Sequence, residues 1–289
     1  MKVAVLGATS KTGRYLIGRL CADGHDVIAL GRERGRLDAL DRRAERRVAD
    51  LDRPDTLKAA LAGAECVVSL AHARHTEALL AALPDTCRRV VSTGSTRKFS
   101  TLADPAADAV RDGEARFLAS KRRGVMLHPT MIYGAPDDRN VNRLLRLIRR
   151  WPRIVPVVLP LPDGGRQHLQ PIFVDDMVEA LVGALTRPSA LGEPVVVAGP
   201  EPISYREMVR ACGQALGRRV YVVAVPGNLL VVAARLAAGL GLALPFDASE
   251  LRRASEDKRH DVTAMRERLG VEPRPFADGL RLKLERGWG

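Results

Sequence analysis

The feature that most constrains how this chain folds is an apolar strand followed directly by a glycine-rich turn and a helix. Lys2 to Leu6 is an unbroken strand-like run, and residues 7–13 (Gly-Ala-Thr-Ser-Lys-Thr-Gly) come immediately after it. From Lys11 to Ala22 apolar residues recur at helical spacing, and Gly24 ends the pattern. Such a turn forms an anion site, because backbone N–H groups and the helix dipole point toward the ligand. We therefore expect the loop to hold the pyrophosphate of a dinucleotide.

The glycine spacing departs from the usual dinucleotide fingerprint at one position. Gly7 and Gly13 stand where the turn and the helix–strand packing need glycine, whereas Ser10 takes the place of the middle glycine. The loop nevertheless follows one strand directly, and a second strand begins thirteen residues after Gly13. This context favours cofactor binding over a turn that merely connects two elements. The loop residues expected at the cofactor are Gly7, Thr9, Ser10, Lys11, Thr12 and Gly13.

The end of the second strand, residues 26–30, discriminates between the two nicotinamide dinucleotides. An acidic residue there binds the ribose 2′-OH of NAD, whereas an arginine accommodates the 2′-phosphate of NADP. This chain has Arg32 with no acid before Glu33, and Lys11 adds a second cation within the loop. The pattern favours NADP(H), with NAD as the other cofactor to consider and two merely solvated cations as the alternative.

Short β-branched runs alternate with longer helical stretches through the first two-thirds of the chain. Buried parallel strands are typically continuous apolar runs, as these are. The alternation predicts an α/β fold with a doubly wound parallel sheet of the Rossmann type and a smaller C-terminal substrate lobe. Further strands are expected near 47–48 and at 66–70, 89–92, 125–127, 172–174 and 195–197, with a helix at 55–62.

Two helix starts are predicted in the second half of the chain. Asp175 or Asp176 follows the strand at 172–174 and is expected to cap a helix rather than to form an acid/base pair. Ser204 to Glu207 has the pattern of a capping box, which opens another helix.

We expect a dinucleotide-binding domain at residues 1–150 and a substrate lobe at 151–289, with 172–200 partly returning to the Rossmann sheet. The segment 228–244 is strongly apolar, but Arg235 interrupts it, and it is shorter than the ~20 residues that span a bilayer. We expect no membrane span, and interpret the segment as a buried or lid-forming helix, with an apolar substrate wall or a partner surface as alternatives.

Composition limits the partners and the compartment. The net charge of +12 is spread along the chain and only 4% of residues are aromatic, so platforms for stacking bases are scarce. We expect no nucleic-acid partner but a small-molecule substrate, apolar ones included, and the sequence leaves a homo-oligomer open. The four cysteines form no CxxC pair and no leader-like segment opens the chain, which favours a reducing, cytoplasmic location. His72 and His75 lack companion ligands, so no metal site is expected.

Taken in order, several motifs resemble the extended and atypical short-chain dehydrogenase/reductase superfamily, the NAD-dependent epimerase/dehydratase-like group. They are the glycine loop 7–13, Asp50-Leu51, Val90 to Thr93, His128 to Gly134, Phe173 to Asp176, and Ala198 to Pro200. The resemblance implies a place at the adenine for Asp50 and Leu51, and at the nicotinamide ribose for Ala71 and His72. It also implies that Pro129 to Ile132 flank the nicotinamide.

The chemistry of that superfamily depends on a Tyr-x-x-x-Lys pair and a nearby Ser or Thr. Glu114 resembles the glutamate that follows the lysine by four residues, which places the missing pair at Ala106 and Val110. By the same resemblance, Thr93 and Ser95 stand at the hydroxyl position. Tyr133 or His128 is the candidate to supply or relay a proton, and Arg97 and Lys98 are candidates to polarise a carbonyl or hold an anionic substrate.

Three interpretations follow from the missing pair. The chain is an NADP(H)-linked oxidoreductase that acts on a carbonyl or alcohol with substitute acid/base groups. Alternatively, it binds the cofactor without turnover, as a structural or sensing protein. The third interpretation is an epimerase or isomerase with tightly held cofactor, which suffers most from the missing tyrosine.

Overall fold

The computed structural model describes residues 1–229, 256 and 258–287, and the chain folds into two compact units. The first unit comprises Met1–Ile132, Val174–Ala198 and Asp261–Pro273, and the second comprises Tyr133–Phe173, Gly199–His260 and Arg274–Gly289. Apart from residues 228 and 229, the apolar segment 228–244 lies outside the described residues. No helix in the described part of the chain is long and apolar enough to cross a membrane.

The first unit is built on a seven-stranded sheet in the order β11-β6-β5-β4-β1-β2-β3, in which every neighbouring pair is parallel. The predicted α/β fold with a doubly wound parallel sheet is therefore confirmed. The strands are β1 (Lys2–Leu6), β2 (Asp26–Gly31), β3 (Glu45–Val48), β4 (Cys66–Ser69), β5 (Arg89–Thr93), β6 (Gly124–Pro129) and β11 (Val195–Val197).

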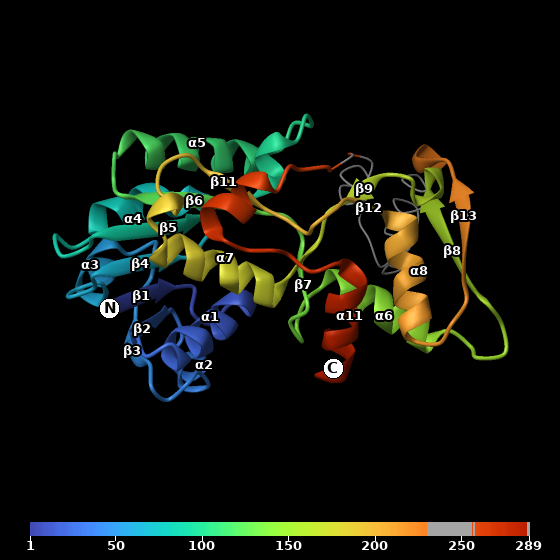
Figure 1. Ribbon diagram of the computed structural model, residues 1–289, viewed down its shortest axis with the longest axis horizontal. Helices are drawn as coiled ribbons and strands as arrows, with labels where there is room; N and C mark the ends of the chain where they lie inside the picture. The colour runs from blue at the N-terminus through green and yellow to red at the C-terminus, as the bar shows by residue number, and fades with distance from the viewer. Residues whose placement is uncertain (230–255, 257, 288–289) are drawn as a thin grey trace. The chain divides into compact units, whose positions relative to one another are not determined.

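Helices cover both faces of this sheet (Figure 1). On one face α1 packs against α7, and Leu16 and Ile17 of α1 are fully buried. On the other face Leu57, Leu79 and Phe117 join one apolar core with the strands. The helices of this unit are α1 (Lys11–Ala22), α2 (Arg34–Asp38), α3 (Pro54–Ala60), α4 (Thr76–Ala82), α5 (Pro105–Ala119) and α7 (Val174–Thr186), with short turns η1 (Ala73–His75), η2 (Thr96–Phe99), η4 (Pro188–Ala190) and η5 (Met265–Leu269).

The predicted cap of α7 was wrong. The helix begins at Val174, directly after the strand β10 (Ile172–Phe173), so Asp175 and Asp176 lie within its first turn rather than before it. In that position their charges still complement the positive end of the helix dipole.

The second unit holds the remaining elements. They are α6 (Asn140–Arg150), β8 (Val157–Pro162), η3 (Asp163–Gly165), β9 (His168–Leu169), β10 (Ile172–Phe173), β12 (Ile203–Ser204), α8 (Tyr205–Ala215), β13 (Val220–Val225) and α11 (Phe276–Glu285), while β7 (Ile132–Tyr133) stands at the boundary of the units in the sequence. The predicted capping box of α8 is confirmed, because the Ser204 hydroxyl accepts from the backbone N–H of Glu207 and the Glu207 carboxylate accepts from that of Ser204.

Residues 133–150 group with the second unit, although we assigned them to the dinucleotide-binding domain. The reason is packing, since Tyr133 lies against Phe173 and Phe276 and α6 packs on α8. A buried ion pair adds to this, because Lys283 of α11 donates to the carbonyl of Ala135 at 2.9 Å and lies 3.2 Å from Asp138. Burial lowers the pKa of Lys283, and the neighbouring Asp138 opposes that shift.

Candidate functional site

Apart from Tyr133, the candidate residues lie at one edge of the first unit's sheet, on loops or at the adjoining ends of strands and helices. Because all seven strands run in parallel, their carboxyl ends meet at the same edge. The strand order reverses between β1 and β4, and ligands of doubly wound sheets bind outside the carboxyl ends at such a point. The glycine loop follows β1 at this position.

The geometry of the glycine loop explains its two glycines. Gly7 has φ +75°, a left-handed conformation that favours glycine. A Cβ at Gly13 would lie 2.4 Å from the carbonyl oxygen of Gly7 and 2.6 Å from that of Ala8, so any side chain there would push α1 away from the loop. The start of the helix therefore lies directly against the loop, as a site for a pyrophosphate requires.

Ser10 fills the place of the middle glycine without strain. Its φ is −71°, which any residue adopts, and its hydroxyl accepts from the backbone N–H of Gly13 at 3.0 Å. The serine therefore acts as the N-cap of α1 and satisfies one of the helix's open N–H groups. Thr12 is buried, whereas Thr9 and Lys11 are partly exposed.

Arg32 lies beside this loop and keeps its charge available. A Cβ at Gly31 would stand 3.4 Å from the methyl group of Thr9, so the end of β2 adjoins the loop. Arg32 is exposed and forms no ion pair with any residue that the structure describes. The acids nearby are engaged by other arginines, Glu33 by Arg36 at 3.7 Å and Asp38 by Arg34 at 3.3 Å.

The residues expected at the adenine and the ribose shape the neighbouring loops. The carboxylate of Asp50 accepts from the backbone N–H of Asp52 at 3.1 Å, and Leu51 packs against the apolar core. After β4, Ala71 is partly exposed, and His72 accepts from the N–H of Arg74 at 3.2 Å. Desolvation lowers the pKa of His72, and the nearby Arg74 adds to that shift. No group of three or more metal-ligating side chains occurs among the described residues.

The loops after β5 and β6 are joined by a buried polar network. His128 at the end of β6 is 1% exposed, and its Nδ1 accepts from the backbone N–H of Ser95 at 3.1 Å. Its Nε2 contacts the carboxylate of Glu114 on α5. The ammonium of Lys98 in turn donates to both oxygens of Glu114, at 2.6 and 2.5 Å. The structure therefore brings together Ser95, Lys98, Glu114 and His128, all of which the sequence singled out separately.

This network stands next to the position of the missing lysine. A Cβ at Gly94 would lie 2.5 Å from the His128 ring and 3.3 Å from a methyl group of Val110, so the three residues pack together. Glu114 follows Val110 by one turn of α5, and Lys98 reaches it from η2. The sequence did not predict this ion pair. The sequence signal that could have indicated it is Glu114 itself. This carboxylate lies on a packed helix, and the residue four positions before it is not a cation.

The other candidate residues of this region make the following contacts. Thr93 is buried and its hydroxyl donates to the carbonyl of Ser69 at 3.0 Å. The hydroxyl of Ser95 accepts from the N–H of Arg97 at 3.1 Å and begins η2. Pro129 accepts from the Thr96 hydroxyl at 3.3 Å, and Ile132 is partly exposed.

Tyr133 belongs to the second unit and is fully buried there. Its hydroxyl donates to the carbonyl of Phe276 at 3.1 Å, and its ring centroid lies 4.8 Å from that of Phe276 and 5.3 Å from that of Phe173. These contacts describe a packed core aromatic whose hydroxyl proton is already engaged.

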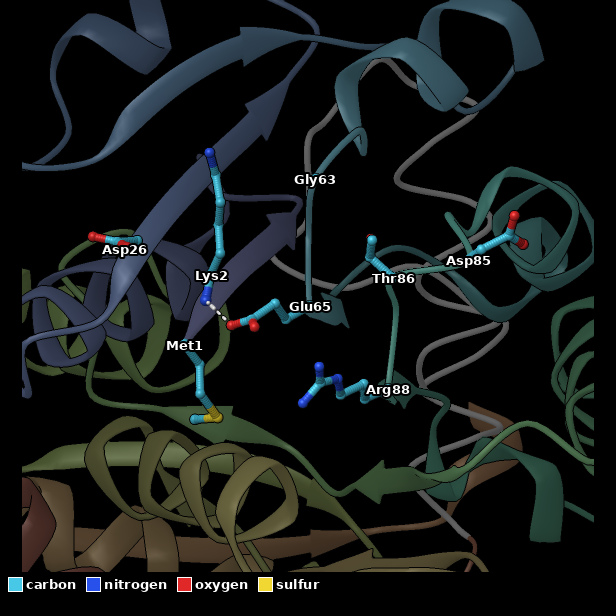
Figure 2. Close-up of a pocket in the computed structure, with 8 residues that line it drawn as sticks. All are labelled: Met1, Lys2, Asp26, Gly63, Glu65, Asp85, Thr86 and Arg88. Carbon is cyan, nitrogen blue, oxygen red and sulfur yellow. Dashed lines mark hydrogen bonds between the residues drawn. The ribbon is translucent and has the colours of Figure 1, made fainter.

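A cavity of about 600 Å³ lies at the opposite edge of the sheet (Figure 2). It is lined by residues at or before the starts of strands, among them Lys2, Asp26, Glu65 and Arg88. The backbone N–H of Lys2 donates to the Glu65 carboxylate at 2.9 Å. Because ligands of doubly wound sheets bind at the carboxyl ends, this cavity is not the candidate cofactor site.

Comparison with known proteins identifies an NAD(P)H-binding domain in this part of the chain. Residues 7–121 match the NAD(P)H-binding family. An uncharacterized protein of Mycobacterium tuberculosis is 26% identical over 276 residues, which make up 94% of this chain and 28% of that protein. The chain thus spans less than a third of the length of this curated relative.

Solved structures resemble the chain over nearly its whole length. UDP-glucose 4-epimerase from Thermotoga maritima with UDP-glucose has a TM-score of 0.77 at 16% identity, covering 99% of this chain and 98% of that one. A short-chain dehydrogenase/reductase superfamily protein from Agrobacterium tumefaciens with bound NAD has a TM-score of 0.71 at 17% identity, covering 99% and 97%. The NADPH-dependent quinone oxidoreductase of Escherichia coli complexed with NADPH has a TM-score of 0.75 at 16% identity, covering 96% and 98%.

Residues 7–121 therefore form an NAD(P)H-binding domain, and the chain as a whole has the fold of these solved structures. The predicted binding of NADP or NAD is confirmed at that level.

Proposed function

We propose that this chain is an NADP(H)-preferring oxidoreductase of the atypical short-chain type, which acts on a carbonyl or alcohol group of a small-molecule substrate. The observation that supports it is the network of Lys98, Glu114 and His128 at the carboxyl ends of β5 and β6. When bound, the cofactor supplies or accepts a hydride at its nicotinamide ring. The protein itself must then provide the proton that the carbonyl oxygen takes up.

In this proposal Lys98 provides that proton. An ammonium has three N–H donors and Glu114 accepts two of them, which leaves the third for a substrate oxygen. As the oxygen takes the proton, the amine is left neutral and regains a proton from water. Glu114 holds the ammonium in place, and His128 positions Glu114 because the bond to Ser95 fixes its ring.

The hydroxyl residues have separate parts in the proposal. The hydroxyl of Ser95 accepts a hydrogen bond from Arg97 and retains its own proton, with which it orients the substrate oxygen. Thr93 supports the loop instead, since its proton goes to Ser69. Arg32 and Lys11 favour NADP over NAD, because a 2′-phosphate gains from two cations and the end of β2 has Arg32 where an NAD-binding acid would stand.

A second candidate is a protein that binds NADP(H) without turnover. Ala106 and Val110 favour it, because neither side chain can exchange a proton at the positions that carry the pair in the superfamily.

The two candidates separate in an experiment on the full chain. Calorimetric titration with NADPH and NADH measures binding, and the absorbance of reduced nicotinamide follows turnover with aldehydes, ketones, quinones, alcohols and nucleotide sugars. We expect tight binding with turnover of at least one substrate class. Tight binding without turnover across this panel would leave only the non-catalytic protein.

Variants test the proton donor. Lys98→Met should lower kcat by about 10²- to 10⁴-fold, the usual contribution of a general acid, with cofactor affinity unchanged. Lys58→Met on the exposed surface of α3 is the matched control and should keep full activity. A kcat that Lys98→Met leaves unchanged would assign the proton transfer to another group.

A further inference from the structure

The second unit carries a cluster of arginines around the loop between α6 and β8 and the turn between α8 and β13. A cavity of about 680 Å³ is lined by Arg149, Arg153, Arg218 and Arg219 together with the loop residues 154–156. A neighbouring cavity of about 470 Å³ shares Arg218 and Arg219 and adds Arg210. No acidic residue lines either cavity. We call these five arginines the arginine surface.

At several positions of this surface, no residue that the structure describes neutralises the positive charge of the arginine. Arg153 and Arg219 form no ion pair with any residue that the structure describes. Arg218 donates to the carbonyls of Trp151, Pro152 and Val155 at 3.1, 2.8 and 3.3 Å, which fixes the loop 151–155 but leaves the positive charge uncompensated. Cations held this way attract an anionic partner.

Apolar side chains point outward beside these arginines. Ile154 is 94% exposed at the α6–β8 loop, which extends away from α6 in Figure 1. In the parallel pair β8–β13, Tyr221 lies opposite Val158 and is 52% exposed, while Val223 lies opposite Pro160 and is also exposed. The alternate residues of β8, such as Val157, are buried. The outer face of the pair is therefore apolar next to a basic rim.

We propose that the arginine surface and Ile154 attach the second unit to the surface of an anionic phospholipid bilayer. Peripheral attachment combines apolar side chains, which enter the headgroup and acyl boundary, with cations that pair with lipid phosphates. A free phosphate would engage the arginines alone and would leave Ile154 without a role. An acidic protein would likewise match the charge, but a single aliphatic side chain this exposed fits a fluid apolar phase better than a fixed partner. This inference stands independently of the proposed enzymatic function.

Vesicle flotation with the full chain tests the proposal. We expect binding to vesicles of phosphatidylcholine with phosphatidylglycerol and little binding to phosphatidylcholine alone. Each arginine near the surface contributes about fivefold to the partition coefficient, so Arg153→Glu with Arg219→Glu should reduce binding by at least 25-fold. Ile154→Ser should reduce it by about tenfold. Urea unfolding, followed by circular dichroism, verifies that each variant is folded.

The matched control is the double variant Arg42→Glu with Arg53→Glu, which makes the same change in net charge at exposed positions of the first unit. An equal loss in this control would mean that net charge alone drives binding, and would overturn the proposal. Full binding by Ile154→Ser, with inorganic phosphate competing better than chloride at equal ionic strength, would identify a phosphate site instead. Failure to bind anionic vesicles while soluble polyglutamate binds would identify an acidic protein partner and would equally reject the lipid surface.

Discussion

The backbone N–H of Ser95 donates to Nδ1 of His128 across 3.1 Å, and this bond decides which nitrogen of a buried imidazole carries the proton. Because Nδ1 is the acceptor, the proton of the neutral ring lies on Nε2, which contacts Glu114. Protonating Nδ1 would break the bond to Ser95, so the network stays intact only while His128 is neutral.

This arrangement predicts how stability depends on pH. Burial lowers the pKa of His128, the charge of Lys98 adds to the shift, and Glu114 opposes it. In the unfolded chain this histidine has its ordinary pKa of about 6.5, so it binds a proton at a higher pH than in the folded chain. The stability that is present at neutral pH is therefore lost as the pH falls below about 6.5. Each unit of pKa depression corresponds to about 1.4 kcal/mol. Urea unfolding at intervals of about one pH unit, between roughly pH 5 and pH 8, measures how the free energy of unfolding depends on pH.

His128→Asn is the variant that isolates the contribution of this histidine. Below a pH of about 6.5, the free energy of unfolding of this variant should depend less on pH than that of the original chain. The remaining pH dependence is expected from groups such as His260, whose pKa is also lowered by burial. An unchanged slope in this variant would show that the His128 network does not titrate as argued.

Gly13 is predicted to be irreplaceable where Gly18, on the same helix, is not. Gly13→Ala would place a methyl group 2.4 Å from the Gly7 carbonyl oxygen, and the resulting overlap should cost about 1–3 kcal/mol and weaken cofactor binding. A Cβ at Gly18 meets nothing within 4 Å, so Gly18→Ala should raise stability by up to about 1 kcal/mol through helix propensity. Urea unfolding and calorimetric titration with NADPH measure both effects. Similar results for the two variants would contradict the close packing of helix and loop.

Arg32 is predicted to set the preference for NADP. Arg32→Asp should weaken NADPH binding roughly tenfold to a hundredfold, the value of a charged hydrogen bond, and affect NADH far less. Arg34→Asp is the control, because Arg34 is also exposed but lies 3.3 Å from Asp38. Equal losses for NADPH and NADH in Arg32→Asp would rule out a 2′-phosphate contact.

Local pattern made most of the first unit predictable. Strands such as β1 and β5 were evident because parallel strands buried on both faces need continuous apolar runs. The position of the candidate site at the carboxyl ends of the strands was also predictable, since the loops that follow parallel strands lie at the same edge of the sheet. The ion pair of Lys98 with Glu114 was not predictable in this way, because the two side chains meet through the packing of η2 on α5. The boundary of the second unit was missed for the same reason, since long-range packing of Tyr133 determines it.

Tyr133 provides the last test, because the sequence proposed it as a proton donor and the structure places it in an apolar core. Tyr133→Phe removes the hydrogen bond to the carbonyl of Phe276, a buried residue, and should cost about 1–3 kcal/mol of unfolding free energy. Turnover should stay unchanged, since the hydroxyl proton is already donated within the second unit. Tyr221→Phe is the matched control, and its loss of an exposed hydroxyl should leave both quantities within about 0.5 kcal/mol. A fall in kcat of about 10²-fold or more in Tyr133→Phe, with stability preserved, would instead make this tyrosine the proton donor and remove that role from Lys98.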